Sequence, residues 1–69
     1  MDIKTKIGAK IRELRHKANL SQEQFGSRCG LDRTYIAGIE QGKRNVSVIN
    51  LEKIAKAFGI SLSELFEDV

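Results

Sequence analysis

Residues 21 to 41, SQEQFGSRCGLDRTYIAGIEQ, contain two helix starts with a short turn between them. Ser21 is an N-cap residue followed three positions later by a glutamine, which is the spacing of a capping box, and Asp32 is a second N-cap residue. Apolar residues flank both caps at the positions of a hydrophobic staple, which fixes the angle at which the chain enters each helix. Gly30 supplies the positive φ that a tight turn needs. The two helices therefore cannot form one straight rod, and the stretch predicts a helix-turn-helix.

The rest of the chain also favours helices, because it has no proline and its apolar residues recur at intervals of three and four. We predict one domain over residues 1–69, an all-α bundle of five helices. The expected helices cover about residues 3–17, two short segments that begin after Ser21 and Asp32, about residues 48–58, and a short segment after Ser61. The expected buried faces of the first and fourth helices are Ile3, Ile7, Ile11 and Leu14, and Val48, Leu51, Ile54, Ala55 and Phe58.

The charge of the chain is unevenly distributed. The net charge is +3, but residues 1–45 hold ten Lys and Arg against five Asp and Glu, whereas residues 46–69 hold two against four. A basic first part and an acidic last part suit a polyanion on one side only, although an ordinary solvated surface is an equal alternative. The single cysteine excludes an internal disulfide and favours a reducing, cytoplasmic setting, and no apolar run is long enough to span a membrane.

The unit from Gln22 to Gln41 resembles the helix-turn-helix of the lambda-repressor-like, Cro/XRE-type family. The likeness rests on small residues at the helix crossing and the turn and on apolar residues of the buried face: Gly26, Gly30, Ile36 and Ile39. Gly26 departs from the alanine usual in the family, which should loosen its helix by about 0.5–1 kcal/mol. Within the family, LDRTYIAGIEQGKRNVS is most similar to the controller proteins of restriction-modification operons. The resemblance implies a five-helix lambda-repressor-like bundle and a transcriptional regulator that binds a palindromic operator as a dimer.

In such folds the second helix of the motif enters the major groove, and its N-terminal residues meet base edges. The expected base-reading residues are Arg33, Thr34, Tyr35 and Gly38. Arg33 can bond O6 and N7 of a guanine, and Thr34 can offer its hydroxyl or its methyl group. Tyr35 can reach a base or a phosphate, with a packing role at the core edge as the alternative. Gly38, without a side chain, permits close approach to the DNA.

The remaining expected contacts concern the DNA backbone and the bracing of the motif. The residues expected at the DNA backbone are Gln22, Lys43, Arg44 and Asn45. Gln22 begins a helix, where free N–H groups favour a phosphate. Arg15 and Glu40 match positions that form an ion pair in the repressor family, between the first helix and the end of the reading helix. The alternative for this pair is an exposed contact worth at most about 1 kcal/mol.

The C-terminal third of the chain carries more apolar residues than its short last helix can bury. The expected dimer interface is Ile49, Leu62, Leu65 and Phe66, and the acidic residues nearby would keep this end away from DNA. The alternative is that the last helix completes the core of the monomer. The expected partners are double-stranded operator DNA and a second copy of the chain, with RNA polymerase as a further candidate.

Other functions find less support in the sequence. His16 and Cys29 are each the only residue of their kind, and a structural zinc site usually needs four such ligands. We therefore expect no metal and no cofactor. We also expect no small-molecule effector, because so small a bundle has little room for a ligand pocket, and no membrane partner. Nothing marks an orienting group or an oxyanion site beside a nucleophile, which disfavours an enzyme. The alternative from another class is a protein-binding, antitoxin-type module of a toxin-antitoxin pair.

Overall fold

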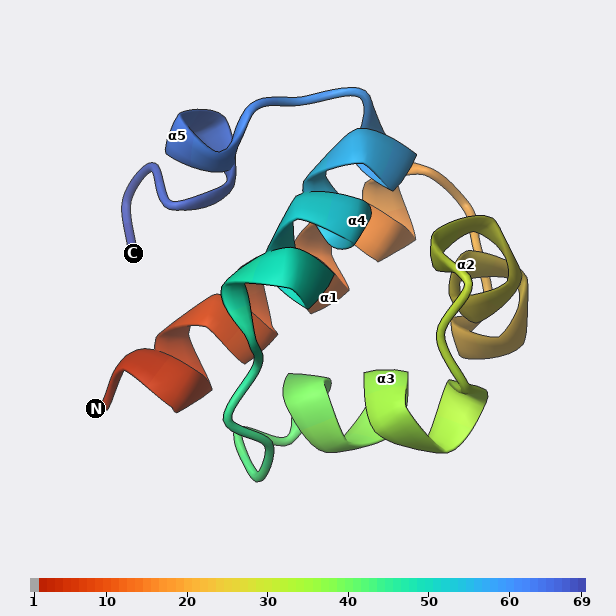
Figure 1. The fold of residues 1–69 in the computed structure, drawn as a ribbon, viewed down its shortest axis with the longest axis horizontal. Helices are drawn as coiled ribbons and strands as arrows, with labels where there is room; N and C mark the ends of the chain where they lie inside the picture. The colour runs from red at the N-terminus through yellow and green to blue at the C-terminus, as the bar shows by residue number, and fades with distance from the viewer. Residues whose placement is uncertain (1) are drawn as a thin grey trace.

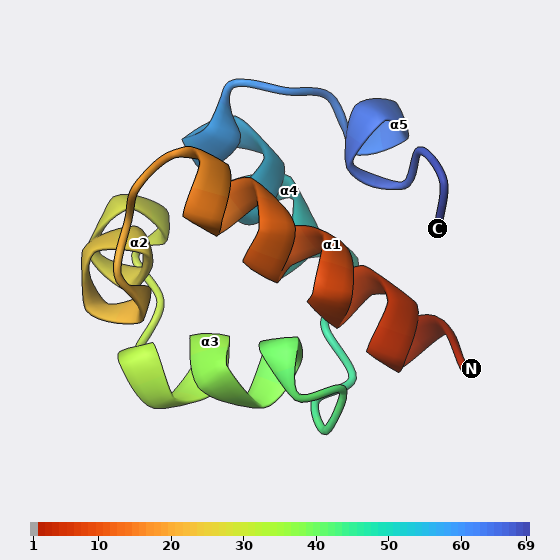
Figure 2. The same cartoon turned by 180° about the vertical axis from the view of Figure 1, so that it is seen from behind.

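The computed structural model describes residues 2–69, and within them the chain forms five helices and no strand (Figure 1). The helices are α1 (Ile3–Lys17), α2 (Gln22–Cys29), α3 (Arg33–Glu40), α4 (Val48–Phe58) and α5 (Leu62–Leu65). α3 packs against α1 and α2, and α2 also packs against α4. α3 and α5 lie on opposite sides of the bundle in both views (Figures 1 and 2). The expected all-α bundle with a helix-turn-helix is confirmed.

The helices begin where the sequence places cap residues. Ser21 and Ser61 each accept a hydrogen bond from the backbone three residues later, and the N3 side chains, Gln24 and Glu64, accept one from the cap backbone in return. Both are capping boxes, and the one at Ser21 was predicted from the sequence. Asp32 caps α3 through the backbone N–H of Thr34, without a box. Since every cap uses residues within a few positions of one another, the sequence alone determines these starts.

The core lies where the inner faces of all five helices meet. Its fully buried large side chains come from each helix in turn: Ile11, Phe25, Ile36, Ile39, Ile54 and Leu65. Phe25 of α2 stacks on Phe58 of α4, with ring centroids 4.4 Å apart, so the two helices share an aromatic contact at the centre of the bundle. In residues 2–69, no helix is long and apolar enough to cross a membrane.

Three apolar residues do not lie where the sequence predicted. Val48 is 72% exposed, although it was expected on the buried face of α4, and Ile3 of α1 is 56% exposed. Each is the first residue of its helix, and the first turn extends beyond the edge of the core. Leu65 was expected at a dimer interface, but it is completely buried within the monomer because α5 packs against α1 and α4. The prediction for Leu65 is therefore corrected, and this residue belongs to the core.

Two glycines allow the motif to pack closely. A Cβ atom on Gly8 of α1 would overlap the carbonyl oxygen of Ile39 at the end of α3. A Cβ atom on Gly26 of α2 would lie 2.5 Å from the carbonyl oxygen of Leu31 in the turn. Both neighbours are backbone atoms, which cannot move aside as a side chain can. Because these two residues have no side chain, α3 can pack close to α1 and α2.

Candidate nucleic-acid interface

The first residues of α3 are exposed. Arg33 and Thr34 occupy the first two helical positions, and both are open to solvent. Asp32 accepts hydrogen bonds from the backbone N–H of Thr34, at 2.8 Å, and from the Thr34 hydroxyl. These hydrogen bonds lower the pKa of Asp32, so the cap is ionised at neutral pH. The Thr34 hydroxyl proton is thereby used within the protein, and its methyl group and remaining oxygen lone pair are what it can offer outward.

Tyr35 is half-buried, and it contacts the core, α4 and the loop after α3. Its ring packs against the core, as the alternative interpretation of this residue expected. Asn50 of α4 donates a hydrogen bond from Nδ2 to the Tyr35 hydroxyl oxygen at 3.1 Å. The guanidinium carbon of Arg44, in the loop after α3, lies 5.4 Å from the ring centroid, which is within the range of a cation–π contact. The Tyr35 ring therefore packs at the edge of the core while its hydroxyl group is held by α4.

The space beside Gly38 is occupied by the same arginine. A Cβ atom on Gly38 would lie 2.8 Å from Cγ and 3.3 Å from Nε of Arg44. Gly38 therefore makes room for the stem of Arg44, although its small size was expected to permit close approach to DNA. The geometry favours the intramolecular explanation. The Arg44 side chain thus lies against both Gly38 and the Tyr35 ring.

The residues expected at the DNA backbone lie in the loop after α3 and at the start of α2. Lys43, Arg44 and Asn45 are all exposed in the loop that follows α3. This loop begins at Gly42, whose φ is +75°, and the backbone N–H of Lys43 bonds to the carbonyl of Gly38 at 3.0 Å. Gln22 is the first residue of α2. The structure thus places basic residues in the loop after α3 and Gln22 at the start of α2.

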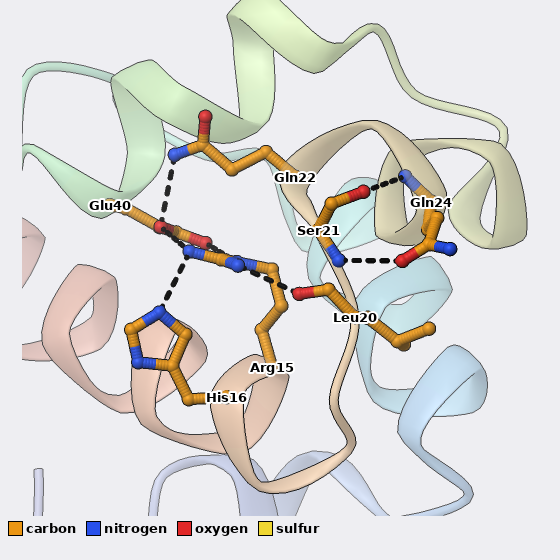
Figure 3. A network of polar contacts seen from close by, with 7 residues as sticks. All are labelled: Arg15, His16, Leu20, Ser21, Gln22, Gln24 and Glu40. Carbon is orange, nitrogen blue, oxygen red and sulfur yellow. Dashed lines mark hydrogen bonds and ion pairs between the residues drawn. The ribbon is translucent and has the colours of Figure 1, made fainter.

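The expected ion pair between Arg15 and Glu40 is present and withdrawn from water (Figure 3). Arg15 donates from Nε to Glu40 Oε2 at 2.7 Å and from Nη2 to Oε1 at 2.9 Å. Their side chains are only 9% and 4% exposed. Arg15 Nη1 also donates to the carbonyl of Leu20 at 2.8 Å, so the guanidinium joins α1, the loop before α2 and the end of α3.

The ion pair also reaches a residue of the candidate interface. Gln22 donates from Nε2 to Glu40 Oε1 at 3.2 Å, and Figure 3 shows the Gln22 side chain extended over the carboxylate. Burial raises the pKa of Glu40, but the hydrogen bonds from Arg15 and Gln22, with the nearby arginine charges, outweigh it and hold the pKa below its usual value. Glu40 therefore stays ionised, and it orients Gln22 as well as Arg15.

Sequence reasoning missed Asn50, which links α4 to Tyr35. The available signal was its position: Asn50 is the third residue of a helix capped by Ser47, where Glu or Gln would complete a capping box. Its side chain is thus free for another contact.

The other residues with reactive side chains show no comparable arrangement. Cys29 is buried, which raises its pKa to about 11. Within residues 2–69, no group of three or more His, Cys, Asp and Glu side chains could hold a metal ion.

The chain is similar to known helix-turn-helix proteins. A family described as "Helix-turn-helix" matches residues 11–65. The control protein C.MunI from a Mycoplasma species is 56% identical over 69 residues, which are 99% of this chain and 93% of that protein.

Two solved structures of controller proteins align with the fold. The restriction-modification controller protein C.AhdI from Aeromonas hydrophila has a TM-score of 0.88 and 48% identity, and the alignment covers 91% of each chain. The controller protein C.Esp1396I was solved as a tetramer in complex with its natural 35 base-pair operator. It has a TM-score of 0.88 and 34% identity, and the alignment covers 97% of this chain and 88% of that one.

Proposed function

The chain belongs to the helix-turn-helix family together with these control proteins, and from that membership we propose that it is a sequence-specific DNA-binding transcriptional regulator. Its similarity to C.MunI and C.AhdI over nearly the whole chain supports the controller of a restriction-modification operon as its role. The observation that carries the proposal is the exposed start of α3, where Arg33 and Thr34 project from a helix braced by a buried ion pair.

Recognition in this proposal follows from the chemistry of the exposed residues. α3 enters the major groove with its N-terminal end first, and Arg33 bonds O6 and N7 of a guanine. Thr34, whose hydroxyl proton is engaged by Asp32, contributes its methyl group to a thymine or its oxygen to a donor on a base. Tyr35 presents its hydroxyl to the DNA. Gly38 contributes indirectly, because it seats Arg44.

Contacts to the DNA backbone would set the register of the reading helix. Gln22 lies at the start of α2, where the N-terminal N–H groups favour a phosphate, and its side chain is held by Glu40. Lys43, Arg44 and Asn45 contact phosphates from the loop that follows α3. These contacts supply affinity that depends on salt, whereas the residues at the start of α3 supply the preference for sequence.

The regulator is proposed to act as a two-fold dimer. Ile49 of α4 is 70% exposed, Phe66 at the end of α5 is 37% exposed, and Leu62 of α5 is half-buried. Covering these side chains with a second copy removes apolar surface from water. The solved complex of C.Esp1396I is described as a tetramer on its operator, which shows that a related chain assembles on DNA. A two-fold dimer reads a near-palindrome whose half-sites lie one helical turn, about 34 Å, apart.

As an activator, the protein would have RNA polymerase as a further macromolecular partner. Its place of action is the compartment that holds the operator DNA, which is the cytoplasm in the bacteria named above. No catalytic step is assigned to it.

The experiment that tests the proposed function is selection of binding sites. The purified protein is incubated with a randomised duplex library, and the enriched sequences are then titrated against a scrambled duplex of equal length. We expect a near-palindromic consensus that binds at least about 10³-fold more tightly than the scrambled duplex at physiological salt. Enrichment of no consensus, or equal affinity for the two duplexes, would refute sequence-specific binding.

A further inference from the structure

The hydroxyl group of Tyr35 receives a hydrogen bond from a different helix. Asn50 of α4 donates from Nδ2 to this oxygen, and the two residues are 15 positions apart in the chain. In the part of the chain that the structure describes, this is the only hydrogen bond made by the Tyr35 hydroxyl. A phenol carries one proton to donate and lone pairs that accept. Because Asn50 uses a lone pair, the hydroxyl proton remains available to a partner outside the protein.

A second contact limits the motion of the ring itself. The Arg44 guanidinium lies over one face of Tyr35, at 5.4 Å from the ring centroid, and the stem of Arg44 fills the space beside Gly38. The ring is therefore held from the loop after α3 and its tip from α4. A side chain fixed at both places loses little conformational entropy when it binds a ligand.

We propose that Asn50 is a positioning residue for DNA recognition, because it accepts no proton from Tyr35 and so reserves the Tyr35 O–H as a donor to the DNA. This inference rests on the proposed function and names a determinant of it that does not itself need to touch the DNA. The group that receives the proton is a hydrogen-bond acceptor of the duplex, either a phosphate oxygen or an acceptor on a base edge such as N7, O6 or O4.

Substitutions at position 50 reverse or remove the hydrogen bond without unfolding the helix. Asn50→Asp has nearly the same shape but only accepts, so the Tyr35 hydroxyl turns its proton toward the carboxylate and away from the DNA. An acidic residue in the first turn of α4 suits the helix dipole, so this variant should fold. Asn50→Ala leaves the hydroxyl free to rotate. Tyr35→Phe removes the hydroxyl and is the reference for complete loss of the donor.

The test is a double-mutant cycle with the duplex that the wild-type protein enriches from a randomised library. Asn50→Asp and Tyr35→Phe should each weaken binding by about three- to tenfold, the value of one hydrogen bond, and Asn50→Ala should weaken it less. In a Tyr35→Phe background, Asn50→Asp should cause only the smaller loss due to its added negative charge. Thermal melts of all the variants should stay within a few degrees of the wild type.

The outcomes separate the inference from the function on which it rests. If the loss caused by Asn50→Asp is the same with and without the Tyr35 hydroxyl, or if position 50 has no effect, the inference is refuted while the proposed function stands. If the wild type enriches no sequence, both are refuted. If the coupling appears, its presence on the scrambled duplex as well identifies a phosphate as the acceptor, and its restriction to the selected duplex identifies a base.

Discussion

Replacing Glu40 by alanine should destabilise the protein by a large part of its total stability. In the intact pair the side chains of Arg15 and Glu40 are 9% and 4% exposed. The substitution therefore leaves the Arg15 guanidinium without its partner at a site that excludes water. Removing one partner of a buried ion pair costs about 3–5 kcal/mol, because the other charge loses its compensation. A domain of 69 residues at about 0.05–0.15 kcal/mol per residue has a total stability of roughly 3–10 kcal/mol. The variant should therefore be partly or wholly unfolded at 37 °C.

Thermal unfolding followed by circular dichroism measures this effect directly. A change of 1 kcal/mol shifts the Tm of a domain this small by about 4–8 °C, so Glu40→Ala should lower the Tm by at least about 12 °C. Glu13→Ala is the matched control, because the Glu13–Lys17 pair is 61% to 72% exposed and its atoms are 3.5 Å apart. Such a pair is worth at most about 1 kcal/mol. Equal Tm shifts in the two variants would refute the assignment of a buried, bracing role to Glu40.

The same carboxylate should make the protein sensitive to acid. The pKa of Glu40 lies below its usual value of 4.5 in the folded protein, so its stabilising effect is complete above pH 4.5 and is lost as the pH falls through the folded pKa. The Tm difference between the wild type and Glu40→Gln should therefore shrink as the pH is lowered from 7 to about 3. A difference that stays constant over this range would show that the ionised carboxylate contributes nothing.

Three further predictions concern packing, assembly and chemical reactivity. Gly8→Ala should destabilise the fold by about 1–3 kcal/mol, because the new Cβ atom meets a backbone oxygen. The matched variant Gly38→Ala should have a Tm near that of the wild type, because the Arg44 side chain can move away. Equal melting temperatures of the two variants would contradict this explanation. Ile49→Lys should convert a dimer into a monomer, as measured by sedimentation equilibrium at micromolar concentration, and the variant monomer should have no lower Tm than the wild-type monomer. An unchanged association state would remove Ile49 from the interface. Cys29 should resist thiol reagents at pH 8 in the folded protein and react on unfolding, because burial raises its pKa to about 11; rapid reaction of the native protein would show that the thiol is accessible.

Features that depend on neighbours in the sequence were predictable. The sequence correctly predicted three cap residues and one turn, which are Ser21, Asp32, Ser61 and Gly30. The caps bond to backbone groups two or three residues away, and the positive φ is a property of Gly30 itself, so neither depends on distant parts of the chain. The Arg15–Glu40 contact came from the resemblance to a known family and not from spacing, since its partners are 25 positions apart.

Features that depend on how the helices pack were not predictable. The alternation of apolar residues places Val48 and Leu65 on apolar faces but cannot tell which faces the core covers, so one is exposed and the other buried. The same limit hid the close approach at Gly8 and the hydrogen bond from Asn50 to Tyr35. To predict either contact, one must know which segments lie next to each other, and only the folded bundle determines this.

The most direct test of the central claim, that the start of α3 reads DNA sequence, is a comparison of Arg33→Ala with the wild type on the selected duplex and on a scrambled one. Lys53→Ala, which removes an exposed positive charge from α4, is the matched control. Losing a bidentate contact to guanine should weaken binding to the selected duplex by roughly ten- to a hundredfold and relax the preference at one base pair of each half-site. Binding to the scrambled duplex should change little more than in Lys53→Ala. Equal losses on the two duplexes, with the base preference unchanged, would reduce Arg33 to a phosphate contact and contradict the account.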